Sequence, residues 1–93
     1  MPPQAERTVT PRQAEVLAFI VTYRARNGYS PSTRDLCQRF GWSSTYTCQG
    51  IIDSLTAKRL LTHVPKVARS YLLTASGSEA AAEWLRHHPE VQP

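Results

Sequence analysis

The chain has 93 residues, which is enough for one compact domain and too few for two. Hydrophobic residues make up 41% and charged residues 19%, which excludes the composition of a disordered protein. Eleven Lys and Arg against seven Asp and Glu give a net charge of +4. This charge fits a nucleic-acid partner without requiring one.

No apolar run approaches the roughly 20 residues of a membrane span, and the first residues contain no apolar signal core. The two cysteines, Cys37 and Cys48, are too few for a disulfide scaffold. We therefore expect a cytoplasmic protein with free thiols. Cys37, Cys48 and His63 could together bind zinc, but the sequence has no CxxC pair, the ligand spacing typical of structural zinc sites. We therefore predict no metal and no cofactor.

Residues 1–9 carry two prolines and no periodicity, which predicts a flexible arm. A helix is expected to follow, because Thr10 is a favourable N-cap, Pro11 suits the first helical position and Gln13 completes a capping box. Apolar residues then recur at helical spacing. The helix should end at Gly28, since glycine accepts the left-handed conformation of a C-terminal cap.

A second helix is predicted after Ser32, another N-cap, with Asp35 in its first turn and Gly41 at its end. A third helix should begin at Ser43 or Ser44. Its apolar residues recur at i, i+3, i+4 and i+7, which predicts one buried stripe. The residues of the stripe are Cys48, Ile51, Ile52 and Leu55.

Two short strands are predicted next, over residues 60–64 and 69–73, with a turn over residues 65–68. Ser76 and Glu79 then have the spacing of a capping box and predict a last helix. This helix should extend over residues 76–89, and residues 90–93 should form a flexible tail.

The element order predicts a mainly α protein with a small β-hairpin wing, that is, a winged helix-turn-helix domain over residues 10–75. It would have a three-helix core plus a C-terminal helix, which either packs on the core or pairs two copies. No Ser-His-Asp ordering or pair of carboxylates predicts catalysis.

Residues 9–73 resemble the amino-terminal DNA-binding domain of LexA-type repressors. VTPRQAEVLAFI resembles that family's first helix, SPSTRDLCQRFGW its second helix and turn, SSTYTCQGIIDSLTAKRLL its recognition helix, and LTHVPKVARSYLL its wing. The most specific part is the string P-[ST]-x-R-[DE]-[LI]-x-x-R-[FL]-G-[WF]. Complete LexA repressors continue into a peptidase domain with a Ser-Lys dyad. This sequence stops at residue 93 with only Lys58 and Lys66 as lysines, so we expect no autoproteolysis and no enzyme.

The resemblance implies double-stranded DNA as the partner, read in the major groove by the start of the third helix. The expected base-reading residues are Ser44, Thr45, Tyr46, Thr47, Gln49 and Gly50. Expected contacts to the DNA backbone are Arg34, Arg39, Lys66 and Arg69. Candidates for a homodimer contact on the last helix are Trp84, Leu85 and Ala81.

Each of these assignments has a structural alternative. The alternative for the base-reading set is a solvated helix face, and Arg39 would also suit the C-terminal dipole of its own helix. Trp84 and Leu85 either cover the first helix or form an apolar patch. Tyr46, Thr47, Gln49 and Gly50 also depart from the residues typical of LexA, so the family's operator sequence does not carry over.

Two functions from different classes remain. The first is a transcriptional regulator, in particular a repressor, that binds a two-fold-related operator as a homodimer. The second is a winged-helix protein-interaction module that modulates a repressor, a polymerase or another host factor. The second is favoured by the modest charge, by the absence of basic residues from residues 43–57, and by the aromatic Trp42, Tyr46 and Trp84.

Overall fold

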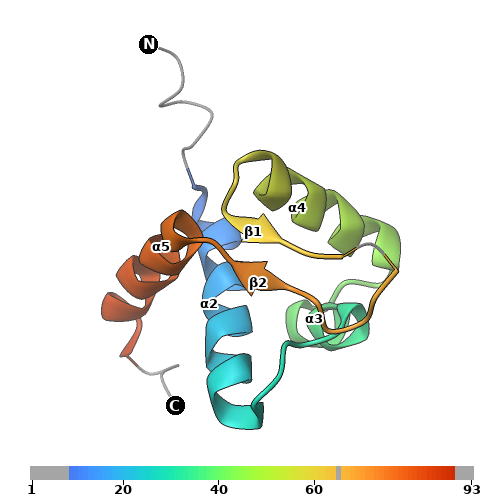
Figure 1. Ribbon diagram of the computed structural model, residues 1–93, viewed down its shortest axis with the longest axis horizontal. Helices are drawn as coiled ribbons and strands as arrows, with labels where there is room; N and C mark the ends of the chain where they lie inside the picture. The colour runs from blue at the N-terminus through green and yellow to red at the C-terminus, as the bar shows by residue number, and fades with distance from the viewer. Residues whose placement is uncertain (1–8, 65, 90–93) are drawn as a thin grey trace.

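Four helices and a two-stranded hairpin follow one another in the computed structural model, which describes residues 9–64 and 66–89. The elements are α2 (Pro11–Asn27), α3 (Thr33–Phe40), α4 (Thr45–Ala57), β1 (Leu61–Thr62), β2 (Leu72–Leu73) and α5 (Ala75–Arg86) (Figure 1). This confirms the predicted fold, mainly α with a hairpin wing. The predicted tail and all of the predicted arm except Val9 lie outside the described residues.

The caps predicted for α2 and α3 are present. Thr10 Oγ1 accepts from the Gln13 N–H at 3.1 Å, and Gln13 Oε1 accepts from the Thr10 N–H at 3.2 Å. Ser32 and Asp35 form the equivalent pair at the start of α3. Both helices end on a left-handed glycine, with φ of 82° at Gly28 and 72° at Gly41. Local sequence signals therefore determine where these two helices begin and end.

The last helix begins earlier than predicted. Its N-cap is Thr74, whose Oγ1 accepts from the Gly77 N–H at 3.1 Å, so the capping box predicted at Ser76 is wrong. Tertiary contacts decide between the two residues. The Thr74 hydroxyl also donates to the Arg59 carbonyl at 2.7 Å, and the Thr74 N–H donates to the Leu60 carbonyl at 3.1 Å.

The strands are also shorter than predicted. Only two residue pairs, Leu61 with Leu73 and Thr62 with Leu72, form the antiparallel ladder. Beyond these pairs, a side chain takes the place of a backbone acceptor, because the Ser70 hydroxyl accepts from the Val64 N–H at 3.0 Å. Ser70 follows Arg69, whose φ of 58° is incompatible with an extended strand. The wing (residues 61–73) is therefore mostly loop.

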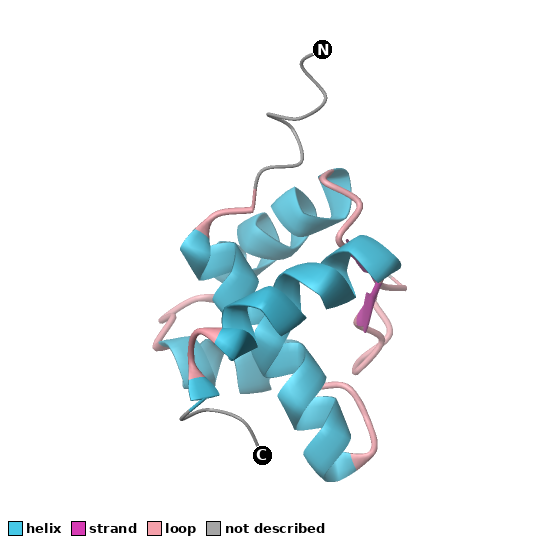
Figure 2. Ribbon diagram, turned by 90° about the vertical axis from the view of Figure 1, so that its left-hand side faces the viewer, coloured by secondary structure: helices cyan, strands magenta, loops and turns pink. Residues whose placement is uncertain are grey.

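One apolar core joins all the helices to the base of the wing. Helix α5 packs along α2, and α3 packs against α4 (Figure 1). Figure 2 shows that helices form most of the molecule, with the short strands at one side. The buried apolar residues are Val16, Leu17, Ala18, Ile20, Leu36, Cys48, Ile52, Leu55, Leu60, Leu61, Tyr71 and Ala81. Within the described ranges, no helix has the length and apolar character needed to cross a membrane.

Candidate nucleic-acid interface

Helix α4 has one face turned into the core and one turned to solvent. Cys48, Ile52 and Leu55 are fully buried, as their spacing predicts, and Ile51 is half-buried. This apolar stripe fixes the rotation of α4 about its axis, because a different rotation would expose it. The opposite side of the helix therefore has a defined orientation toward solvent.

All six residues predicted to read bases are exposed. Ser44 is the N-cap of α4 and accepts from the Thr47 N–H at 3.4 Å. Tyr46 is 87% exposed, the largest value among the exposed large hydrophobic side chains. The structure thus presents this set on the first two turns of α4 without using its side chains for packing.

The side chain of Gln49 is hydrogen-bonded within α4. Its Nε2 donates to Asp53 Oδ1 at 2.9 Å, one helical turn further on. This bond uses one of the two N–H groups of the amide, so the second N–H and the oxygen Oε1 can still bond to a partner. Asp53 was absent from the residues predicted to read bases, although its i+4 spacing from Gln49 was visible in the sequence.

Gly50 lies beside these side chains and leaves an open position on α4. A Cβ built on Gly50 would meet no atom of the described residues within 4 Å. Nothing in the described part of the fold therefore requires a glycine here. A glycine inside a helix costs about 0.5–1 kcal/mol relative to alanine.

The four basic residues predicted to contact the DNA backbone fall into two pairs. Arg34 on α3 and Lys66 in the wing are exposed, and neither has a partner in the part of the chain that the structure describes. Arg39 instead forms an ion pair with Glu15 at 3.5 Å and lies 4.9 Å from the ring centre of Phe40. Two of the four are thus free to meet an anion, whereas Arg39 and Arg69 are exposed but contact other side chains of the protein.

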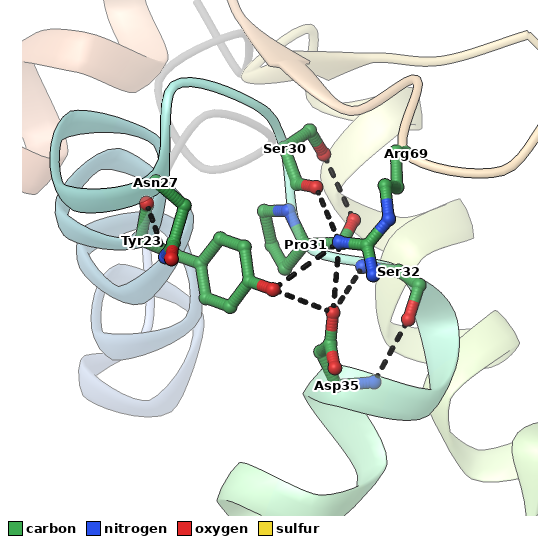
Figure 3. A network of polar contacts seen from close by, with 7 residues as sticks. All are labelled: Tyr23, Asn27, Ser30, Pro31, Ser32, Asp35 and Arg69. Carbon is green, nitrogen blue, oxygen red and sulfur yellow. Dashed lines mark hydrogen bonds and ion pairs between the residues drawn. The ribbon is translucent and has the colours of Figure 1, made fainter.

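Arg69 is the more strongly engaged of the second pair (Figure 3). Its Nη1 lies 3.1 Å from Asp35 Oδ2, 3.1 Å from the Ser30 carbonyl and 3.2 Å from Tyr23 Oη. The guanidinium also lies 4.8 Å from the ring centre of Tyr29. One side chain from the wing therefore contacts α2, α3 and the segment that joins them.

The charges of this network support one another. The pKa of Asp35 is lowered, first by the backbone N–H of Ser32, then by the Tyr23 hydroxyl and by Arg69. The pKa of Arg69 is raised, chiefly by its hydrogen bond to Tyr23. Both side chains therefore stay charged over the physiological pH range.

A groove of about 420 Å³ separates the start of α4 from the wing. Gln49 of α4 and Lys66 of the wing both line it. Thr33 and Tyr71 line it as well and share a hydrogen bond of 2.7 Å between their hydroxyl oxygens. His63 also lines this groove. The sequence suggested no role for His63 apart from the zinc site with Cys37 and Cys48, which was not predicted.

The residues predicted for a dimer contact differ in how far they are buried. Ala81 is 1% exposed and belongs to the core, so it is not part of a surface that a second copy could reach. Trp84 and Leu85 are half-buried and line a groove of about 710 Å³ between α2 and α5. Trp84 also stacks on His88, with ring centres 3.8 Å apart.

The two cysteines are free thiols. Burial, and then the neighbouring Cys37, raise the pKa of Cys48 to about 11. Among the described residues, no group of three or more His, Cys, Asp and Glu side chains could hold a metal ion.

The sequence of the chain matches a known protein family. The family described as "LexA DNA binding domain" matches residues 6–70. The chain belongs to this family. The match covers α2, α3, α4 and most of the wing, and it confirms the family resemblance seen in the sequence.

The chain is also similar in sequence to individual LexA repressors. It is 33% identical over 72 residues to the LexA repressor of Ligilactobacillus salivarius, covering 77% of this chain and 35% of that protein. It is 37% identical over 73 residues to the LexA repressor of Limosilactobacillus fermentum, covering 78% and 35%. For LexA repressor 1 of Pseudomonas putida the values are 33% over 75 residues, 81% and 36%. The chain thus spans about a third of the length of these relatives.

Proposed function

We propose that this LexA-family domain is a sequence-specific double-stranded DNA-binding repressor that reads the major groove with the outer face of α4. The observation that carries the proposal is the exposure of all six predicted base-reading residues at the start of the second helix of a helix-turn-helix. That helix is the one that enters the major groove in such motifs. We place the activity in the cytoplasm, where the DNA target would be.

The chemistry of α4 favours base reading over simple charge attraction. Residues 43–57 contain no Lys or Arg, so this helix offers hydrogen bonds and methyl groups rather than positive charge. The amide of Gln49 would donate to and accept from an adenine edge, and the Thr47 methyl would contact a thymine methyl. Arg34 and Lys66 would supply the phosphate contacts that fix the register.

The test is selection of bound duplexes from a random pool at about 50 mM salt, where counterion release favours binding most. We expect enrichment of one consensus and a loss of affinity as salt rises. Failure to retain any duplex at this salt concentration would overturn the proposal. Capture of a protein that survives nuclease treatment, with no duplex retained, would instead favour an interaction module.

We also propose that two copies bind one two-fold-related site, with Trp84 and Leu85 of α5 at the contact. Both side chains are large and apolar, and both are half-buried at the edge of the groove between α2 and α5. A single helix-turn-helix reads few base pairs, and dimers double that number. A two-fold-symmetric consensus and a Trp84→Ala variant that sediments as a monomer are expected. An asymmetric consensus with a monomeric wild type would contradict the proposal.

A further inference from the structure

We propose that Arg69 is a positioning residue of the DNA interface, which holds the wing on the corner between α2 and α3, and that it does not itself contact phosphate. The part of this inference that concerns DNA rests on the proposed function above. The sequence had assigned Arg69 to the DNA backbone, as it had Lys66. The surroundings of the two residues separate them.

Several acceptors surround the guanidinium of Arg69. Its Nη1 has three oxygen atoms within 3.2 Å, from Tyr23, Ser30 and Asp35. Figure 3 shows the side chain extending from the wing to this corner. A phosphate that took over this nitrogen would have to displace the Asp35 carboxylate or lie beside it. Repulsion between the two anions makes that contact unfavourable.

The backbone of Arg69 is left-handed, with φ of 58°, a region that costs a residue with a Cβ about 1–2 kcal/mol. Lys66 shares this conformation, with φ of 66°, so the backbone does not distinguish the two residues. What distinguishes them is the side chain, because that of Arg69 contacts Asp35 and the Ser30 carbonyl and offsets part of the cost.

The contact between Arg69 and Asp35, called the clamp below, joins the wing to α3. Asp35 lies on α3, the helix that precedes α4, so Arg69 fixes the wing relative to the reading helix. Lys66, three residues before Arg69, lines the same groove as Gln49 of α4. Without the clamp the wing would have to be ordered when DNA binds, and that ordering would lower the affinity.

The test compares Arg69→Met, Asp35→Asn and the double variant with wild type, all in the complete chain. Asparagine keeps a side-chain oxygen for the cap of α3. We expect each single variant to weaken duplex binding by about 5- to 50-fold and the double variant to be no weaker than the worse single one, as for two residues of one interaction. Tyr23→Phe, which removes only a hydroxyl, is the milder variant if Asp35→Asn fails to fold.

The salt dependence of binding distinguishes positioning from phosphate contact. Arg69→Met should retain the wild-type slope of log affinity against log salt, whereas Lys66→Met should lower it by about 0.9. The proposal is overturned if Arg69→Met lowers the slope as Lys66→Met does while Asp35→Asn binds as tightly as wild type.

A measurement without DNA keeps this inference separate from the proposed function. Amide hydrogen exchange in the wing should accelerate in both Arg69→Met and Asp35→Asn, while exchange in the core of α2 stays as in wild type. Unchanged wing exchange in both variants would refute the clamp even if the chain binds DNA. Accelerated exchange in a chain that binds no duplex would support the clamp and refute the function.

Discussion

Gly50 in α4 and Gly77 in α5 both lie inside helices, but their surroundings are opposite. A Cβ on Gly77 would lie 1.9 Å from the carbonyl oxygen of Leu60, whereas a Cβ on Gly50 would meet nothing within 4 Å. The first glycine lets a helix approach the base of the wing. The second leaves an open position on the surface that we propose reads DNA. The comparison separates residues that the fold requires from residues that only a partner would require.

Gly77→Ala should have the largest effect. The added methyl group overlaps backbone rather than a flexible side chain, so α5 would have to move away from Leu60. We expect a loss of about 3 kcal/mol or more in the free energy of unfolding, at the upper end for overpacking. Urea denaturation measures it, with the exposed Ser76→Ala as the control. A loss below 1 kcal/mol would show that the contact is easily relaxed.

Gln49→Ala on the outer face of α4 should separate binding from stability. We expect binding to the selected duplex to weaken by about 1–3 kcal/mol, the range for a good base contact. Its free energy of unfolding should change by less than about 0.5 kcal/mol, as for other exposed positions. Fluorescence anisotropy and urea denaturation measure the two quantities. Equal losses in both would mean that Gln49 serves the fold.

Loss of Arg34 should change the salt dependence of DNA binding more than loss of an arginine elsewhere on the surface. Arg34→Ala should lower the slope of log affinity against log salt by about 0.9, because one phosphate contact is lost. Arg26→Ala is the matched control, since it removes the same charge from an exposed position on α2. A change of equal size in both variants would indicate a general charge effect instead of a contact.

Gly50→Ala should have a smaller effect, and its sign should differ between the two measurements. The helix gains about 0.5–1 kcal/mol because alanine is the better helix former and the added methyl group has space. Binding to the selected duplex should weaken, because the methyl group would occupy the position that the DNA approaches. A variant that is both more stable and binds as tightly would show that DNA does not approach α4 at Gly50.

The smallest effect concerns pH. The pKa of Asp35 in the folded chain lies below its ordinary value, so the carboxylate stabilises the fold above the unfolded-state pKa of about 3.9. That stabilisation is lost as the pH falls from there through the folded-state pKa. Asp35→Asn should reduce this part of the acid dependence. Thermal melts between pH 2 and pH 6 test it, and an identical acid profile in the variant would contradict it.

Local signals in the sequence sufficed for some parts of the fold. The Thr10 and Ser32 caps and the glycines that end α2 and α3 each act within a few residues, so a pattern is enough to place them. The start of α5 was misplaced because Thr74 has a tertiary partner, the Arg59 carbonyl, that no local pattern contains.

The site divides in the same way. The exposed face of α4 followed from the apolar stripe opposite to it. The contacts of Arg69 could not be predicted in this way, because its partner Asp35 lies 34 residues away in the chain. The pairing of Arg39 with Glu15 likewise joins two different helices. Sequence periodicity shows which side chains point outward, and only the folded structure shows which of them already have a partner.

The central claim is that the outer face of α4 reads bases. The most direct test crosses wild type and Gln49→Ala with the selected duplex and with duplexes changed at one base pair each. Wild type should lose about 1–3 kcal/mol at the base pair that Gln49 contacts, and Gln49→Ala should lose that discrimination only there. Unchanged discrimination at every base pair in Gln49→Ala would contradict the reading role assigned to Gln49 on this face.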